Sequence, residues 1–377
     1  MPYWRLSGFY FFYFATVGAL VPYWGLYLQS IGFAPLDIGL LMSLLMISRI
    51  VAPNIWGWIA DHRGQRMAVV RLAGFLAVAA FTGVFFGKSF WWLAAVMLAF
   101  SFFWNASLPM LEAATLSHLG ARATAYGYVR LWGSIGFIIT VSVVGPVLDQ
   151  QGTERLLPIL AGLMSGIWAF SLLVPESEAA GRAAHPQPFL KVILRKEMFA
   201  FLLACFLMQA SHGPYYTFYS IYLDNHGYSK GLIGLLWAFG VICEIGVFLS
   251  MRPLLDRFHL RTVLLVSFLL AALRWLLIGR FPDDIAVLAA AQALHAATFG
   301  AFHATAMQMI HRFFIGHHQH RGQAIYSSAS FGLGGAAGSF YSGYIWSAWS
   351  ASAAFNLATG LAMLAFMVTL LGLRLKN

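Results

Sequence analysis

Long apolar runs alternate with short polar turns along the whole chain. A helix that crosses a bilayer needs about 20 mostly apolar residues, and twelve segments of this kind fit into the 377 residues. The pattern therefore predicts an all-α membrane protein with twelve transmembrane helices in two sets of six. The expected spans are 6–30, 36–60, 67–87, 91–117, 123–147, 156–174, 198–223, 230–251, 262–280, 285–310, 322–347 and 350–373.

A polar stretch and an internal repeat divide the chain into halves. Residues 175–197 form the longest polar stretch, and we expect a cytoplasmic loop there between six-helix bundles at 1–174 and 198–377. A shift of 195 positions lays Tyr27 on Tyr222 and Arg49 on Glu244. A repeat of this length predicts two copies of one module. The same shift also matches Gly32 with Gly227, Asp61 with Asp256 and Arg66 with Arg261.

The composition supports a membrane location. Charged residues make up 10% of the chain and apolar residues 60%, whereas a soluble domain has about 25% charged residues. Of the 23 Lys and Arg residues, sixteen fall in the turns of one side, four on the other side and three within spans. Basic residues gather in cytoplasmic loops, so we expect a cell inner membrane protein with both termini in the cytoplasm. Topology then accounts for the net charge of +10, and no nucleic-acid partner is implied.

One cytoplasmic turn carries a family signature. The turn Gly57-Trp-Ile-Ala-Asp61-His-Arg63-Gly64-Gln-Arg66 is similar to the loop motif of the major facilitator superfamily, although His62 and Gln65 stand where that motif has basic residues. The resemblance covers essentially the whole chain and implies the major facilitator fold, two pseudo-symmetric six-helix bundles. Further stretches resemble the phenylpropionate permease branch, which is related to nucleoside and oligosaccharide proton symporters: Tyr126–Phe137, Ser211–Tyr216 and Trp237–Glu244.

Five charged residues fall inside the predicted spans. A charge at the centre of the bilayer costs roughly 2.5–3.5 kcal/mol even on the lenient insertion scale. Each of these residues therefore needs a partner or a water-filled cavity. Transporters commonly place charges on the substrate path, but structural ion pairs that hold helices in register are the alternative. The five are Arg49, Glu112, Arg130, Glu244 and Arg274.

Glu112 and Arg130 are placed to form a substrate site. They lie on either side of the turn near Gly120, each about equally far from its centre, so a helical hairpin would bring them to a similar depth. Asn105 lies two helical turns before Glu112, on the same face. This spacing resembles the substrate-binding face of lactose permease-like symporters. The resemblance implies that Arg130 binds a polar or anionic group, since its fork pairs bidentately with a carboxylate.

Glu244 is the preferred candidate for the coupling proton. Burial raises the pKa of a carboxyl group and a nearby cation lowers it, as a proton-coupling site requires. Arg49 is expected to face Glu244, either as part of proton coupling or as a permanent lock between the halves. Glu112, Arg274 and His303 complete the proton-coupling candidates. The tenth span also holds His295, and a histidine in a polar contact between helices is the alternative for both histidines.

Aromatic and polar residues gather in the first and seventh spans. Pro214 can bend the seventh span, and bent helices near the midplane are where transporter sites form. We expect His212 and Tyr216 to bind substrate there. Tyr23, beside Pro22 in the first span, is a further substrate-binding candidate, with an interfacial aromatic belt as the alternative.

Charges in the cytoplasmic turns predict gating. Asp61, Arg66, Asp256 and Arg261 are expected to form salt bridges that stabilise one of two states. Simple surface ion pairs are weak, but their placement at equivalent positions of both halves favours a gate.

The sequence therefore predicts a secondary transporter that works by alternating access. The first candidate is proton symport of a small aromatic organic acid, and the second is nucleoside or sugar proton symport. A membrane-embedded substrate sensor is the alternative from another class. The partners are a small-molecule substrate, protons and the lipid bilayer, and the protein is expected to act as a monomer. No motif for catalysis, a cofactor or a metal is recognised.

Overall fold

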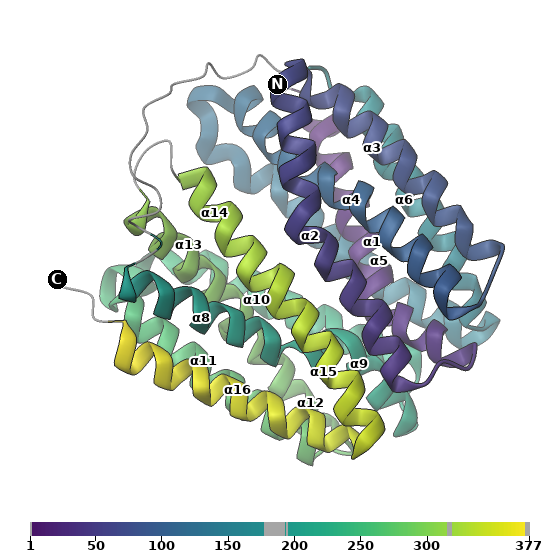
Figure 1. The fold of residues 1–377 in the computed structure, drawn as a ribbon, viewed down its shortest axis with the longest axis vertical. Helices are drawn as coiled ribbons and strands as arrows, with labels where there is room; N and C mark the ends of the chain where they lie inside the picture. Colours follow the sequence, from purple (N-terminus) through teal and green to yellow (C-terminus); the bar gives the residue numbers. More distant parts are fainter. Residues whose placement is uncertain (1, 177–192, 194, 315–318, 374–377) are drawn as a thin grey trace. The chain divides into compact units, whose positions relative to one another are not determined.

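The computed structural model describes residues 2–176, 193, 195–314 and 319–373, and every regular element within them is a helix (Figure 1). Ten of the described helices are long and apolar enough to cross a bilayer. Two more helical stretches, 196–225 and 319–348, are each built from shorter pieces. The prediction of an all-α membrane protein is confirmed. The predicted loop 175–197 lies mostly outside the described residues.

The first repeat consists of long helices with short 3₁₀ turns between some of them. Proline lies inside four of these helices, α1, α2, α4 and α5, without ending them. The elements are α1 (Tyr3–Ser30), α2 (Pro35–Arg63), α3 (Arg66–Phe81), η1 (Thr82–Phe85), α4 (Phe90–Leu119), η2 (Gly120–Ala125), α5 (Tyr126–Gln151), η3 (Thr153–Arg155) and α6 (Leu156–Leu173).

The second repeat has the same order of spans but a more broken backbone. Three of its spans are divided, and two of these contain a π-helical segment. The elements are α8 (Lys196–Ser211), α9 (Gly213–Asn225), α10 (Lys230–Arg257), α11 (Leu260–Arg280), α12 (Ile285–Ala293), η4 (Ala296–Ala301), α13 (Phe302–Phe313), α14 (Gln319–Ser327), η6 (Ser328–Gly334), α15 (Gly335–Ala348) and α16 (Ala351–Gly372).

The shift of 195 positions seen in the sequence also relates the two sets of helices. Added to the bounds of α1, it gives 198–225, which lies within the stretch 196–225 that α8 and α9 occupy. Gly32 and Gly227, which follow these spans, both have positive φ, at 96° and 84°. Residues with a side chain rarely adopt a positive φ. Glycine therefore allows the same turn at equivalent positions of the two halves. The packing repeats as well, because α3 contacts α6 in the first repeat as α11 contacts α16 in the second.

The chain forms two compact units. Unit 1 comprises residues 1–33, 47–182 and 228–235, and unit 2 comprises 34–46, 183–227 and 236–377. The opening turns of α2 therefore belong to unit 2 and those of α10 to unit 1. In unit 2 the backbone N–H of Leu36 donates to Ser347 Oγ at 3.0 Å. In unit 1 the Asp149 carboxylate accepts from the N–H groups of Lys230 and Gly231, at 2.9 and 2.8 Å, and so caps the start of α10.

The break between α8 and α9 has a local chemical cause. Pro214 has no N–H and cannot bond to the carbonyl of Ala210 one turn earlier. The hydroxyl of Tyr341 on α15 donates to that carbonyl instead, at 3.1 Å. Gly213 and Gly338 let the two backbones meet, since a Cβ at Gly213 would lie 2.2 Å from the Gly338 carbonyl. The bend that the sequence predicts at Pro214 is therefore stabilised by a specific contact with α15.

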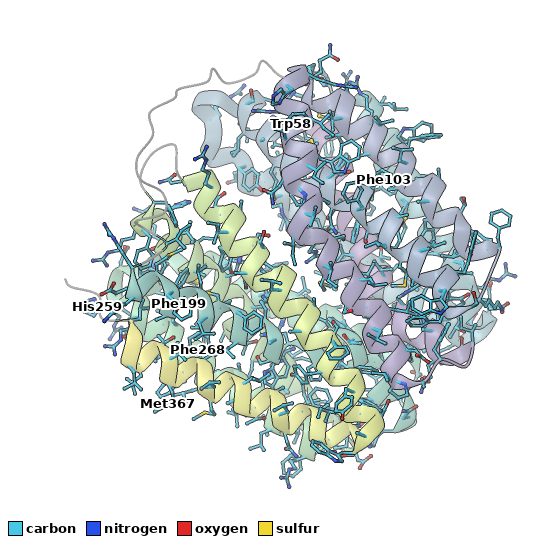
Figure 2. All side chains as sticks on the ribbon, in the orientation of Figure 1. Trp58, Phe103, Phe199, His259, Phe268 and Met367 are labelled. Atoms are coloured by element: carbon cyan, nitrogen blue, oxygen red, sulfur yellow. The ribbon has the colours of Figure 1, made fainter. Side chains whose placement is uncertain are left out.

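Apolar side chains project from the outer surfaces of the helices (Figure 2). Trp58 on α2 is 62% exposed and Phe199 on α8 is 65% exposed, whereas Phe268 on α11 is fully buried. Such large exposed apolar side chains are expected where a helix faces lipid. Each unit thus has a packed interior and an apolar exterior.

Candidate functional site

A polar cluster lies inside unit 2 around Arg274. This residue is in α11 and is fully buried. Its Nη1 atom donates to His295 Nδ1 at 3.0 Å and to Thr298 Oγ1 at 3.2 Å. Its Nη2 atom donates to Gln292 Oε1 at 3.2 Å. Gln292 and His295 precede the π-helical segment η4, and Thr298 lies within it. All three acceptors therefore come from the interrupted tenth span.

His295 joins Arg274 to a carboxylate. Its Nε2 atom lies 3.3 Å from Glu244 Oε2 on α10, and both side chains are largely buried. A guanidinium group only donates hydrogen bonds, so the Nδ1 atom that faces Arg274 must accept. The Nε2 atom then carries the ring proton and donates it to Glu244. The order Arg274–His295–Glu244 therefore fixes the tautomer of a neutral imidazole.

Aromatic rings close this cluster off. The Cζ atom of Arg274 lies 4.1 Å from the centroid of the Tyr215 ring and 4.7 Å from that of Trp275. The Tyr215 hydroxyl also donates to Gln292 Oε1 at 3.0 Å. Cation–π contacts of this kind gain strength when they are desolvated. Tyr215 on α9 thus links the broken seventh span directly to the buried arginine.

His212 lies at the break between α8 and α9 and is also fully buried. Its Nδ1 atom is 2.8 Å from the carbonyl of Met208, which can only accept. His212 therefore donates through Nδ1 and keeps a lone pair on Nε2. That Nε2 atom has no hydrogen-bond partner in the described part of the chain. Tyr216 stacks beside it with ring centroids 5.6 Å apart, so the structure brings together the two residues predicted for the seventh span.

The Glu112 region of unit 1 differs from the pairing that its spacing suggests. Glu112 Oε1 accepts from the Tyr126 hydroxyl at 3.2 Å. Among the described residues no ion pair within 4 Å joins Glu112 to Arg130. Arg130 instead lies against aromatic rings, with Cζ 3.7 Å from the centroid of Phe14 and 5.8 Å from that of Tyr10. The structure thus places an arginine beside rings of α1 and gives the nearby acid a tyrosine partner.

Two other substrate-binding candidates make contacts between helices of unit 1. The side-chain amide of Asn105 donates to Ser48 Oγ at 2.7 Å. The Tyr23 hydroxyl lies 2.6 Å from the carbonyl of Val141 and 3.3 Å from that of Lys230. Both side chains are buried. They connect α4 to α2 and α1 to α5.

The predicted gating residues have different surroundings. Arg66 lines a pocket in unit 1, and Arg261 donates from Nη2 to the carbonyl of Leu370 near the end of α16. Asp256 is exposed near the end of α10. Asp61 lies in α2, but its side chain is outside the described ones.

The proton-coupling candidates Arg49 and His303 lie outside the Arg274 cluster of hydrogen bonds. Arg49 is half-buried on α2 of unit 1. The His303 Nδ1 atom lies 3.1 Å from the Tyr326 hydroxyl. Of the two histidines of the tenth span, His295 is thus the one whose ring nitrogen lies beside Glu244.

Sequence reasoning did not assign roles to Gln292, Thr298 or Tyr215. A signal for the first two was present, since Gln292, His295 and Thr298 follow one another at intervals of three residues on one helix face. Polar groups at such spacing in an apolar span predict a polar partner on a neighbouring helix. Tyr215 had no such signal, because tyrosine is also frequent at membrane interfaces.

Arg274, His295 and Glu244 form a buried polar cluster across three spans, one of which is interrupted by a π-helical segment. Buried charges of this kind within membrane spans are typical of transporters. The chain belongs to the MFS_1-like family of the major facilitator superfamily, whose profile matches residues 3–357. It is similar to a probable 3-phenylpropionic acid transporter of Escherichia coli (strain K12), with 29% identity over 352 residues that cover 89% of each protein. A maltose permease of Geobacillus stearothermophilus is 26% identical over 351 residues, covering 92% of this chain and 88% of that protein.

Solved structures show the same fold. The crystal structure of the nucleoside transporter NupG matches with a TM-score of 0.87 at 17% identity and covers 100% of both chains. A bacterial homologue of the lysosomal transporter Spinster matches with a TM-score of 0.73 at 12% identity, covering 98% of this chain and 94% of that one. The family resemblance and the major facilitator fold predicted from the sequence are confirmed. The chain is a transporter of small molecules and not an enzyme.

Proposed function

We propose that this protein carries a small aromatic organic acid together with protons by alternating access. The single observation that carries the coupling part of the proposal is the chain Arg274–His295–Glu244, with distances of 3.0 and 3.3 Å. Arg274 and an ionised Glu244 balance each other's charge. One added proton leaves a buried net positive charge, which is costly unless an anion arrives with it. Such a cluster favours binding a proton and a carboxylate together.

Arg130 is the proposed partner of the substrate carboxylate. The Arg130 Cζ atom lies over the Phe14 ring, 3.7 Å from its centroid, and a guanidinium group above a ring can still pair bidentately with a carboxylate. Tyr10 and Phe14 would then contact the aromatic body of the substrate. The name of the relative from Escherichia coli, a probable 3-phenylpropionic acid transporter, supports this substrate class.

Proton coupling is proposed for Glu244 first, with His295 as the group that orients it. Arg274 is proposed to set the charge of the cluster. Arg49 pairing with Glu244, Glu112 as a competitor for Arg130, and a role for His303 remain predictions. Asp61, Arg66, Asp256 and Arg261 remain proposed gating residues, and Asn105, His212, Tyr216 and Tyr23 remain proposed substrate contacts.

A nucleoside or sugar proton symporter is the second candidate. The observation that favours it is the Nε2 atom of His212, a buried acceptor without a partner in the described structure. A neutral acceptor suits a hydroxyl donor better than a carboxylate. The names of the maltose permease and of NupG agree with such substrates. The third candidate function is that of a substrate sensor with the same fold.

One transport experiment separates these candidates. The purified protein is reconstituted into vesicles, and uptake of labelled 3-phenylpropionate, uridine and maltose is measured with and without an imposed proton gradient. The proposal expects accumulation of the aromatic acid that collapses when a protonophore removes the gradient. Gradient-driven accumulation of uridine or maltose alone supports the second candidate. Binding without accumulation of any of the three supports a sensor.

The setting in the cell is also proposed. Sixteen basic residues on one side of the predicted spans against four on the other favour cytoplasmic termini in the inner membrane. The protein is proposed to act as a monomer, since both clusters described above are built within one chain.

A further inference from the structure

A pocket between α2 and α4 of unit 1 is lined by none of the proposed substrate-binding or proton-coupling residues, and by one proposed gating residue, Arg66. Its volume is about 160 Å³. Seven of its lining residues are apolar and one, Arg66, is charged. The lining residues are Pro53, Gly57 and Ala60 on α2, Arg66 on α3, and Ala106, Pro109, Met110 and Ala113 on α4.

Small side chains create this space. Gly57, Ala60, Ala106 and Ala113 contribute at most one side-chain carbon each to the lining. No atom lies within 4 Å of a Cβ placed on Gly57, so the space beside it is open. In most helix contacts, small residues bring two helices together. Here they leave a gap instead, which indicates room for something other than a neighbouring side chain.

The pocket is lined by two prolines and one cation. Pro53 and Pro109 lie inside α2 and α4, and each lacks the N–H that would bond to the carbonyl one turn earlier. Among the lining residues Arg66 is the single cation. Arg63, three residues earlier, is exposed and does not line the pocket. The pocket is thus a mostly apolar space whose lining includes one arginine.

We propose that this pocket is a second binding site, which takes a small amphipathic anion. A cavity of about 150 Å³ is known to bind benzene, so the apolar body would be about the size of one aromatic ring or a short alkyl chain. Arg66 would bind the anionic head, because its fork matches a carboxylate or a phosphate. The lining includes no residue of the Arg274 cluster and neither Glu112 nor Arg130, so this inference goes beyond the proposed function.

Two sources can supply this chemistry. One is an aromatic carboxylate such as the proposed substrate, held a second time away from Arg130. The other is a bilayer lipid whose acyl chain enters between α2 and α4 while its phosphate contacts Arg66. Anionic lipids are enriched at the cytoplasmic leaflet, where the sequence places the α2–α3 turn. The ligand class is the same in both cases, and an experiment with two probes identifies the source.

The test is photo-crosslinking on the full-length protein in phosphatidylcholine nanodiscs. One probe is 3-phenylpropionate with a diazirine on its ring, and the other is phosphatidic acid with a diazirine in its acyl chain. Crosslinked peptides are identified by mass spectrometry. We expect one probe to label residues 53–60 and 106–113. Arg66→Gln should raise the probe concentration for half-maximal labelling roughly tenfold or more, as expected for loss of a charge-assisted hydrogen bond.

Matched variants give the test its controls. Arg63→Gln removes an arginine from the same turn and should leave labelling unchanged. Gly57→Leu fills the open space while keeping Arg66, and should abolish labelling. If that variant is not monodisperse, Ala113→Leu replaces it on the opposite wall. Arg130→Gln should weaken uptake of 3-phenylpropionate but leave labelling of residues 53–60 and 106–113 unchanged. A failure of the proposed transport function can therefore be distinguished from a failure of the second site.

Each outcome decides the proposal. If the carboxylate probe labels the pocket and the labelling depends on Arg66, the ligand is the substrate. If the phosphatidic acid probe does so, the ligand is a lipid. Labelling of neither helix by either probe overturns the proposal. It is overturned equally if Arg66→Gln and the filled-pocket variant label as the unchanged protein does.

Discussion

The Nε2 atom of His295 lies 3.3 Å from Oε2 of Glu244, while its Nδ1 atom accepts from Arg274 at 3.0 Å. The histidine therefore connects two opposite charges that do not touch each other directly. Any change of protonation at one end alters the hydrogen bonds at the other. This relationship makes the cluster sensitive to single substitutions, and each member gives a different expectation.

Replacing Glu244 with Gln should separate coupling from translocation. The amide cannot take up a proton but still accepts from His295. We expect loss of proton-driven accumulation, while exchange of labelled for unlabelled substrate across vesicles persists. The control is Asp283→Asn, an exposed acid in the turn before α12, which should transport normally. Uphill uptake that survives in the Glu244 variant would refute its role.

Two replacements of His295 should differ in stability. Phe removes both ring nitrogens and leaves Arg274 and Glu244 buried with fewer partners, whereas Gln keeps a donor and an acceptor. Leaving a buried polar group unsatisfied costs about 1–3 kcal/mol. We expect His295→Phe to lower the free energy of unfolding by about that amount relative to His295→Gln. Denaturant titration in detergent measures the difference, and equal stability of the two variants would contradict the bonding described here.

Arginine at position 274 should not be replaceable by lysine. The guanidinium group uses two nitrogens to bond three side chains, and its Cζ atom lies 4.1 Å from the centroid of the Tyr215 ring. Lysine keeps the charge but not the planar fork. We expect Arg274→Lys to lose most gradient-driven uptake although the protein folds. Full activity in this variant would show that charge alone is needed.

Arg130 should be selective for the acid group of the substrate. We expect Arg130→Gln to raise the half-saturation concentration for 3-phenylpropionate roughly tenfold or more, because a charge-assisted hydrogen bond is lost. Binding of the neutral alcohol 3-phenylpropanol should change little. Calorimetry on the purified protein compares the two ligands. A parallel loss for both would indicate that Arg130 supports the fold and does not read the carboxylate.

The contact between Gly213 and Gly338 should tolerate no side chain. A Cβ at Gly213 would lie 2.2 Å from backbone atoms of Gly338, and overpacking of this kind costs typically about 1–3 kcal/mol. Gly360 on α16 is the matched control, since nothing lies within 4 Å of a Cβ there. We expect Gly213→Ala to unfold at a lower temperature and Gly360→Ala to equal or exceed the unchanged protein. The order of the two melting temperatures decides the point.

The repeat made most of the fold predictable. Once Tyr27 matched Tyr222, the bounds of the first six helices implied those of the second six, and the structure follows the same shift. The bend at Pro214 was also predictable, because a missing N–H acts locally. The π-helical segment Ala296–Ala301 was not. Within this segment Thr298 accepts from Arg274, which lies 24 residues earlier in the chain, and a local sequence pattern does not reveal such a contact.

The sequence identified the charged residues inside the spans, but it did not identify the residues that form hydrogen bonds with them. Depth alone placed Glu112 near Arg130, yet the bond to Glu112 comes from Tyr126, which lies four residues nearer to the turn. His295 and His303 are eight residues apart and therefore on a similar helix face. Sequence spacing could not choose between them, because the π-helical segment between them changes the rotation of the helix. Only the observed contacts identify His295 as the neighbour of Glu244.

The sealed position of Arg274 also constrains how the protein is assembled. Before the π-helical span has been synthesised, α11 would carry an arginine with none of its three side-chain acceptors in place. Such a segment resists leaving the translocation channel by itself, at roughly 2.5–3.5 kcal/mol on the insertion scale. The arginine's acceptors are synthesised only after it, within residues 292–298. We therefore expect α11 to insert stably only after the following span has been synthesised. Membrane insertion of the second half would then involve several spans together.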